Sequence, residues 1–323
     1  MENFDLTAVI PAHNAADTIT SLVEEFLSIP DLAVQVIVVD DASSDDTPRL
    51  VQGLMDRHPE VLAILQPTNG GAGVARNVGF PAATGRYTIF FDADDQLHPD
   101  ALVAAVQELD RGEQDVAILK YRYVRGGQDT DVAMNSHDLN IFDKVLGSAS
   151  SRTVRLVDAP DLLHLTNYPW NKVVRTATFQ ESGLTFGSTT VHNDILGHWH
   201  TLLFADRIVL ISQEVCTHIV LAGGNNLTNR SSRDRLTLFD ALDETYDLLV
   251  RNPALRKRYA HIYWGSVIRV AGWAAARVDQ SVRDAFDARL QEHLLRINLA
   301  DFYNIQVRRA PSLAQTIVRK AMG

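Results

Sequence analysis

"RYTIFFDADDQ", residues 86–96, joins an apolar run typical of a buried strand to three carboxylates within four positions. Side by side, Asp92, Asp94 and Asp95 repel one another and raise one another's pKa unless positive charge compensates them. A bound metal ion would supply that charge. Water could equally solvate these carboxylates if they lie at an exposed strand end before a helix N-terminus. The helical pattern of residues 100–109, which follows at once, fits this alternative. The triplet alone leaves both interpretations open.

Around this stretch, the first 120 residues alternate between two periodicities. Short apolar runs are followed by amphipathic helical patterns, which predicts parallel strands joined by crossover helices. We expect strands at residues 6–11, 34–41, 61–65, 86–91 and 115–124. We expect helices at residues 19–27, 46–55, 73–84 and 100–109. The pattern loosens after residue 125, where a strand at 207–218 is expected, and it becomes helical from about residue 226.

The composition favours a globular, cytoplasmic protein. With 323 residues and 46% hydrophobic content, the chain can fill a sizeable core. Its formal charge of -10 argues against nucleic acid as the main partner. The single cysteine, Cys216, excludes an intramolecular disulfide and a cysteine-based zinc cluster, and it fits a reducing compartment. We expect neither a secretory signal nor a membrane span, because Arg269 interrupts the longest apolar run.

Polar side chains follow three of the predicted strands. In an open parallel sheet the carboxyl ends of the strands lie at one edge, where ligands bind. Because residues alternate faces along a strand, Asp92 and Asp94 are expected to point the same way. They would share one cleft with the residues that end the other two strands. Those residues are Pro11, Ala12, His13, Asn14, Asp40 and Asp41.

Familiar nucleotide and metal motifs do not account for this cleft. A dinucleotide site needs G-x-G-x-x-G after the first strand, whereas the glycines here follow the third, in residues 69–77. The phosphate-loop pattern G-x-x-x-x-G-K-[ST] is absent. We expect no zinc site, because His198 and His200 would lie on different faces of a helix.

Three segments stand in an order and spacing that resemble the family 2 glycosyltransferases. They are "VIPAHNA" (9–15), "VIVVDDASSDDT" (36–47) and "NGGAGVARNVGFPAATGRYTIFFDADDQLHPDAL" (69–102). The resemblance is close over residues 6–110 and is to bacterial enzymes of cell-surface polysaccharide and wall teichoic acid. It implies an α/β fold of the GT-A type, a Rossmann-like mixed sheet flanked by helices. We expect a GT-A domain at 1–225, with a nucleotide-sugar half (1–120) and an acceptor half (121–225), and a C-terminal helical region at 226–323.

By that resemblance, the cleft binds a nucleotide sugar. Asp41 would contact the nucleobase, Asp92 the ribose region, and Asp94 a Mn²⁺ or Mg²⁺ ion through the D-x-D motif, with Ala93 between them. The resemblance also places Pro11, Ala12, His13 and Asn14 against the donor. Arg76 would lie near the acidic cluster or the phosphates, and it could equally be a helix-face arginine paired with a carboxylate.

The same resemblance extends to the acceptor half. Family members follow a W-N-K/R segment, here "YPWNKVV" with Trp170, by an acidic pair at a helix start. Asp194 matches the second residue of the pair and would be the general base, whereas Asn193 stands where the family has Glu. At a helix N-terminus the macrodipole would lower the pKa of Asp194. Trp170 would stack on a sugar or belong to the core. His218 would be a further metal ligand or an ordinary histidine.

These expectations add up to a metal-dependent, inverting hexosyl- or N-acetylhexosaminyl-transferase. The donor would be a UDP-sugar and the acceptor a hydroxyl of a cell-surface glycan or of a polyol phosphate. The alternative is a non-catalytic nucleotide-sugar or polysaccharide-binding module, which should tolerate loss of Asp94 or Asp194. The C-terminal helices could support a homo-oligomer. Their last basic residues flank an apolar stretch that would touch an anionic membrane surface, or would cap the domain with a solvated face. Those residues are Arg308, Arg309, Arg319 and Lys320.

Overall fold

The computed structural model describes residues 4–125, 134–220 and 233–322. Within them one mixed sheet runs in the order β3-β2-β1-β4-β8-β6-β9-β5, and β7 pairs with β9. The strands are β1 (Leu6–Ala12), β2 (Val34–Asp40), β3 (Val61–Leu65), β4 (Tyr87–Phe90), β5 (Gln96–Leu97), β6 (Val116–Arg125), β7 (Ser151–Val154), β8 (Lys172–Arg175) and β9 (Ile208–Val220). Strands β1 to β4 are mutually parallel, while β8 is antiparallel to both β4 and β6.

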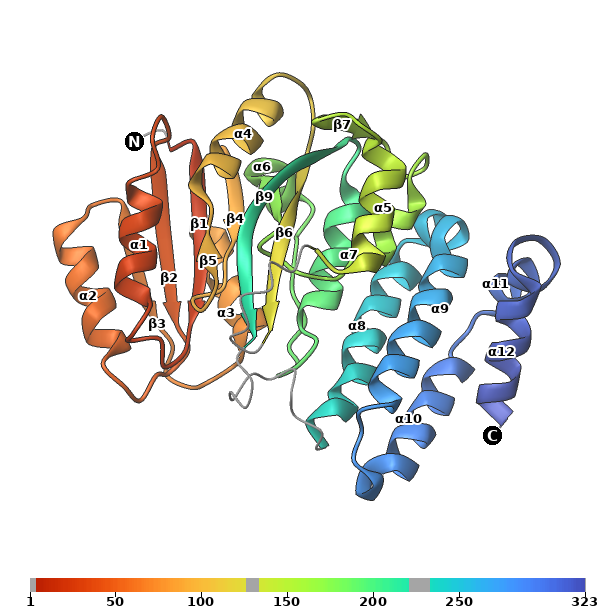
Figure 1. Cartoon of the computed structure of the whole chain (residues 1–323). Coiled ribbons are helices and arrows are strands. Elements are labelled where there is room, and N and C mark those ends of the chain that lie inside the picture. Colours follow the sequence, from red (N-terminus) through yellow and green to blue (C-terminus); the bar gives the residue numbers. More distant parts are fainter. Residues whose placement is uncertain (1–3, 126–133, 221–232, 323) are drawn as a thin grey trace.

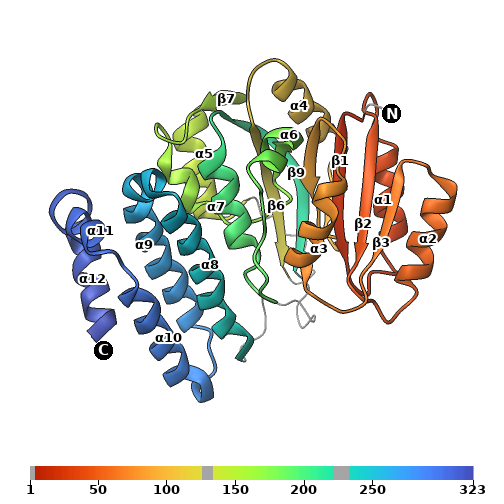
Figure 2. The same cartoon turned by 180° about the vertical axis from the view of Figure 1, so that it is seen from behind.

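The helices cover the sheet and then continue beyond it (Figures 1 and 2). Those before the C-terminal region are α1 (Ile19–Leu27), α2 (Thr47–Arg57), α3 (Ala72–Gly79), α4 (Pro99–Asp110), α5 (Ser136–Leu146), α6 (Thr176–Glu181) and α7 (Asp194–Phe204). Those of the C-terminal region are α8 (Thr237–Arg251), α9 (Pro253–Ala275), α10 (Arg283–Leu295), α11 (Leu299–Asn304) and α12 (Pro311–Met322). The short helical turns are η1 (Phe80–Ala82), η2 (Pro160–His164), η4 (Arg233–Leu236), η5 (Gln280–Val282) and η6 (Ile305–Arg309), the last of them π-helical.

The strands predicted in the first 125 residues are confirmed, and their burial explains the sequence pattern. Every residue of β1 is buried, and β2 is buried except at one position, as expected of strands covered by helices on both faces. The predicted helix at 73–84 is shorter than expected. It ends at Gly79, and the chain continues as the turn η1, whose Pro81 cannot donate a helical hydrogen bond.

Three short strands were not predicted. β5 has two residues, and β7 and β8 have four each, so none is long enough to show a period. β8 nevertheless fills the centre of the sheet, because it lies between β4 and β6 and pairs with both. Its position brings the acceptor half of the chain into the same sheet as the first half.

The C-terminal helices lie beside α7, at the end of the molecule away from β1, β2 and β3 (Figures 1 and 2). The domain boundary predicted near residue 226 falls outside the described residues. No helix in the described part of the chain is long and apolar enough to cross a membrane.

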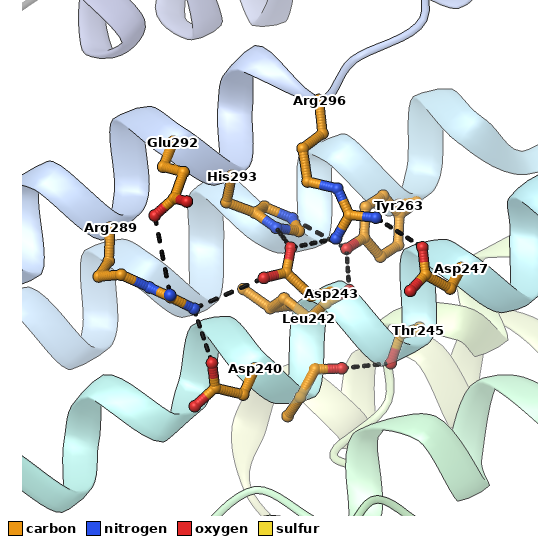
Figure 3. Close-up of polar contacts among 11 residues, drawn as sticks. Asp240, Leu242, Asp243, Thr245, Asp247, Tyr263, Arg289, Glu292, His293 and Arg296 are labelled. Carbon is orange, nitrogen blue, oxygen red and sulfur yellow. Dashed lines mark hydrogen bonds and ion pairs between the residues drawn. The ribbon is translucent and has the colours of Figure 1, made fainter.

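A polar network joins α8 to α10 (Figure 3). The buried His293 ring hydrogen-bonds through Nδ1 to Asp243 (2.7 Å) and through Nε2 to the Tyr263 hydroxyl (3.0 Å). The Asp243 carboxylate also accepts a hydrogen bond from Arg296. Burial alone would raise the pKa of Asp243, but the hydrogen bonds and charges of His293 and Arg296 outweigh it and lower that pKa.

We expect Asp243→Asn to lower the free energy of unfolding by about 2 kcal/mol at neutral pH, because it removes a charged acceptor shared by two helices. The control is Glu292→Gln, whose side chain is 72% exposed, and which is expected to change stability by less than about 0.5 kcal/mol. Urea unfolding across pH checks both. Since the folded pKa of Asp243 is lowered, its contribution is present above the unfolded pKa and is lost as pH falls through the folded value. An Asn variant equally destabilised in strong acid would contradict this assignment.

Candidate active site

The carboxyl ends of β1, β2 and β4 meet at one edge of the sheet, as predicted. Ala12 pairs with Asp40 at the last register position of β1 and β2. The segments that follow are hydrogen-bonded together, since the Asn14 amide donates to Ser43 Oγ (2.9 Å) and Asn14 Oδ1 accepts from the Ser44 amide (2.8 Å). Polar groups from separate strands therefore border one site.

Backbone strain gathers at the same place. Among the described residues, four that are not glycine have a positive φ; Asn14 (52°) and Ala42 (55°) follow β1 and β2, and His192 (68°) lies two residues before Asp194. A left-handed conformation costs on the order of 1–3 kcal/mol for such residues and persists only where the surroundings enforce it. Strain of this kind is concentrated at functional sites.

Asp41 holds the glycine-containing loop in place. Its Oδ1 accepts from the Gly70 amide (2.7 Å) and from Gln66 Nε2 (2.8 Å), and its Oδ2 accepts from the Gly71 amide (2.7 Å). His13 Nδ1 lies 2.9 Å from the Asp41 carbonyl oxygen. A role at the nucleobase stays a prediction for Asp41, and the lone pair left on Oδ2 would serve it.

The acidic triplet is arranged by a turn. β4 ends at Phe90, and the Asp95 amide donates to the Asp92 carbonyl (3.3 Å). The expectation that Asp92 and Asp94 share a strand face is therefore wrong, because both residues lie beyond the strand. Asp92 turns to Arg76, whereas Asp94 is exposed. Although the Asp94 side chain is open to solvent, the protein around it displaces part of its hydration; this desolvation, followed by the charge of Asp92, raises the pKa of Asp94.

Arg76 links the two halves of the site. This side chain of α3 is 3% exposed and donates from Nη2 to Asp92 Oδ1 (2.5 Å) and from Nη1 to Asn193 Oδ1 (2.9 Å). Arg76 thus lies at the acidic cluster and is paired with one of its carboxylates, while a role at the phosphates stays a prediction. Asn193 immediately precedes Asp194, the first residue of α7.

Gly73 lets α3 approach the segment that carries Asn193. A Cβ atom at Gly73 would lie 2.1 Å from the Gly187 carbonyl oxygen and 2.8 Å from Asn193 Cβ. The Gly187 amide in turn donates to the Asn193 carbonyl (2.7 Å). Only glycine fits this contact, which sets the distance between Arg76 and the start of α7.

Asp95 and His218 form a buried pair on the other side of the triplet. His218 Nδ1 lies 2.6 Å from Asp95 Oδ1, and the second oxygen, Oδ2, is buried without a partner among the described residues. Burial raises the pKa of Asp95 to about 6. Burial would lower the pKa of His218, but the hydrogen bond and charge of Asp95 outweigh it and raise that pKa. With Nδ1 engaged, His218 has Nε2 left for a ligand.

Asp194 is partly buried, and its pKa is raised, whereas its position at a helix N-terminus predicted a lowered pKa. Burial raises the pKa of Asp194 to about 6; the charges of Arg76 and Lys172 lower it and the charge of Asp92 raises it further. Lys172 is buried, with Nζ 2.6 Å from the Tyr168 carbonyl oxygen, and burial lowers its pKa to about 7. A carboxylate with a pKa near 6 suits a proton acceptor at neutral pH.

Trp170 belongs to the core. Its side chain is fully buried and stacks on Tyr168, with ring centroids 4.3 Å apart and planes 17° apart, while Tyr121 contacts it edge-on. No face of the indole is open to a sugar, so we do not retain a stacking role for Trp170. The ring instead backs His218, whose centroid lies 5.6 Å away.

The contacts of several residues were not anticipated. Gly73 and Asn193 act through partners far away in the sequence, Lys172 acts through its charge on Asp194, and Asp95 was singled out only as part of the triplet. The glycine-rich run was the one signal for Gly73. Pro11, Ala12 and Ala93 lie at the expected edge, the first two buried and the third partly so.

Comparison with known sequences gives a consistent match. Residues 7–181, more than half of the chain, match the family described as Glycosyl transferase family 2. The succinoglycan biosynthesis protein ExoO of Rhizobium meliloti is 40% identical over 114 residues, which are 35% of this chain and 32% of ExoO. TarS of Staphylococcus aureus, a poly(ribitol-phosphate) beta-N-acetylglucosaminyltransferase, is 30% identical over 122 residues, 37% of this chain and 21% of TarS. The chain thus matches about a third or less of these relatives' length.

Solved structures share the fold over nearly the whole chain. TarS 1-349 in complex with UDP-GlcNAc has a TM-score of 0.75 at 19% identity, covering 98% of this chain and 88% of that one. The mannosyltransferase PcManGT from Pyrobaculum calidifontis, in complex with GDP-Man and Mn²⁺, has a TM-score of 0.53 at 17% identity, covering 100% and 84%. At such identities the likeness concerns the fold alone. It confirms the predicted GT-A α/β fold with C-terminal helices.

The contact at Gly73 can be tested with two glycines. We expect Gly73→Ala to cost about 2 kcal/mol or more, because the new methyl group must displace backbone. Gly53→Ala in α2 is the matched control: its Cβ would meet only the end of the Arg57 side chain at 3.7 Å, so it should stabilise the fold by about 0.5–1 kcal/mol. Urea unfolding measures both. Equal effects of the two substitutions would show that α3 does not depend on the close contact.

Proposed function

The chain belongs to glycosyl transferase family 2, and from that premise we propose that it transfers a sugar from a UDP-sugar to a hydroxyl of a cell-surface glycan or polyol phosphate. The reaction inverts the anomeric carbon, with Asp194 as general base and a divalent cation at the donor. The protein works in the cytoplasm. The part up to about residue 225 carries the reaction, and the helices that follow form a separate region.

The bridge made by Arg76 is the observation that carries this proposal. Its guanidinium joins Asp92, on the donor side, to Asn193, the neighbour of Asp194. A single displacement needs its base across the sugar from the leaving group, at a fixed distance from the donor. A buried, doubly hydrogen-bonded arginine supports that fixed relation between donor site and base.

The base acts on the acceptor. As the acceptor oxygen attacks the anomeric carbon, its proton passes to Asp194. The new glycosidic bond forms while the bond from the same carbon to the diphosphate oxygen breaks, and the nucleoside diphosphate leaves with that electron pair. Burial keeps the Asp194 pKa close enough to neutrality for it to take the proton and release it later.

The residues around the triplet fit a divalent cation, Mn²⁺ or Mg²⁺. Asp94 is exposed, and His218 keeps Nε2 free because Asp95 engages Nδ1, an arrangement typical of metal-binding histidines. The unpartnered Asp95 Oδ2 is a further acceptor close by. Among the described residues no group of three side chains is already gathered for a metal, so the diphosphate and water would complete the coordination. Such an ion neutralises charge on the leaving diphosphate.

Two relatives guide the choice of substrates. The name of TarS describes N-acetylglucosamine transfer to poly(ribitol phosphate), and its structure holds UDP-GlcNAc. We therefore propose a UDP-sugar with a hexosyl or N-acetylhexosaminyl group. A non-catalytic binding module would gain nothing from a base with a raised pKa at the donor site, so the pKa of Asp194 favours the enzyme.

Asp194→Asn is expected to lower kcat by about 10²–10⁴-fold, because the amide cannot accept the proton. The Kd for the donor should stay within about twofold of the wild-type value, since a general base stabilises mainly the transition state. For the wild type, activity should rise with pH through about 6 and then level off as Asp194 ionises. UDP release measured with panels of UDP-sugars and acceptors, poly(ribitol phosphate) included, checks both. A fully active Asn variant would exclude Asp194 as the base.

The metal assignment has a separate test in calorimetric titration of UDP with and without Mn²⁺. Asp94→Asn should abolish the Mn²⁺-dependent part of binding, because it removes a ligand. Asp95→Asn should weaken it about 10–100-fold by releasing His218. Asp284→Asn, a remote exposed acid on α10, should bind like the wild type. Binding that is equally strong without Mn²⁺, or in Asp94→Asn, would refute the metal and leave the role of Asp194 open to its own test.

A further inference from the structure

Charge is unevenly distributed along the chain. Residues 251–323 hold thirteen Lys and Arg against five Asp and Glu, a formal charge of +8 within a protein of -10. The first 250 residues therefore carry -18. A basic segment on an acidic protein indicates a partner of negative charge for that segment alone.

Exposed apolar side chains concentrate in the same region. The described part of the chain has eleven large hydrophobic residues that are exposed, and six of them lie within residues 295–322. They are Leu295 (69%), Leu299 (84%), Tyr303 (60%), Val307 (56%), Val318 (48%) and Met322 (80%). Single exposed apolar residues are ordinary, but a cluster in so short a segment marks an interaction surface.

The spacing of these residues places them on helix faces. Leu299, Tyr303 and Val307 recur every four residues through α11 and η6, which keeps each close to the next, and Leu295 ends α10 just before them. An aromatic residue with a polar tip, such as Tyr303, suits a boundary between water and an apolar phase.

α12 has the same character. Its inner side buries Ala314 and Ile317, and its outer side exposes Val318, Arg319 and Met322. Apolar and basic side chains thus share the outer face. In both views α11 and α12 lie at the end of the molecule farthest from α2 (Figures 1 and 2).

No carboxylate of the described residues neutralises the basic residues at this end of the chain. Within the described chain, Arg308, Arg309, Arg319 and Lys320 form no ion pair with a carboxylate, whereas Arg289 of α10 and Arg296 just after it pair with acids of α8. The one acid between residues 296 and 322 is Asp301, which is buried and lies 3.2 Å from Arg256. The positive charge is therefore available to a partner.

We infer that the outer face of residues 295–322, the C-terminal surface, docks on the anionic headgroup surface of a bilayer. Apolar side chains would enter the headgroup region while the arginines contact lipid phosphates. A second copy of this chain fits less well, because pairing two such surfaces would bring like charges together with no acid free to offset them. This inference is independent of the catalytic proposal.

Binding of this kind has two components that respond differently to salt. Each basic residue near an anionic surface strengthens binding by several-fold, and salt screens that part. The apolar part resists salt. The acidic first 250 residues are repelled by the same surface, so only the C-terminal end should face it.

The test is co-sedimentation of the full chain with vesicles of phosphatidylcholine, and of phosphatidylcholine mixed with phosphatidylglycerol. We expect binding to the mixed vesicles only, weakening as salt rises. Arg308→Gln with Arg309→Gln should reduce partitioning on the order of 10- to 30-fold. Leu299→Ser with Tyr303→Ser should remove the binding that survives high salt.

The matched control is Arg49→Gln with Arg57→Gln on α2, which removes the same charge at the opposite end of the molecule and should bind like the wild type. Unchanged circular dichroism and Tm would show that each variant is folded. Three outcomes would overturn the inference: no binding to mixed vesicles, equal binding to neutral vesicles, or equal loss in the α2 control. Self-association without lipid that the Arg308 and Arg309 substitutions abolish would also overturn it, in favour of a contact between copies.

Discussion

The burial of one guanidinium group constrains the whole site. Arg76 is 3% exposed, and a charge taken out of water is tolerated only with good partners. Its partners come from two places: Asp92, after β4, and Asn193, before α7. β4, α7 and α3 must therefore keep their relative positions, because otherwise the buried Arg76 guanidinium loses its hydrogen bonds. Gly73 makes this possible because a Cβ at this position would clash with Gly187 and Asn193.

The sequence was most informative where structure is local. The strands before residue 125 and the meeting of three strand ends follow from periodicity and from the geometry of parallel sheets, and both are confirmed. Contacts such as Asp95 with His218 join residues 123 positions apart, and nothing in either neighbourhood announces the other. The place of β8 between β4 and β6 was hidden for a similar reason, since four residues carry too little pattern to specify two partners.

Single residues were hardest to interpret where burial decides between two roles. A tryptophan in a motif can stack on a ligand or fill a core, and only the packing of Tyr168 and Tyr121 around Trp170 separates the two. For Asp194, burial likewise decides in which direction the pKa is shifted. The helix N-terminus suggests a lowered pKa, but the pKa is raised, because burial outweighs the favourable charges of Arg76 and Lys172. Burial depends on the whole fold and so cannot be found in a local pattern.

The departure at Asn193 acquires a physical meaning from these contacts. A carboxylate at that position would share Arg76 with Asp92 and would add a negative charge beside Asp194. Both changes would push the pKa of Asp194 upward, since the positive charge that lowers it would be divided and a repelling charge added. Asn193 accepts the same hydrogen bond from Arg76 without that charge. The amide thus keeps the geometry of the bridge while leaving the Arg76 charge to Asp92 and Asp194, which holds the base nearer to its ionised form at neutral pH.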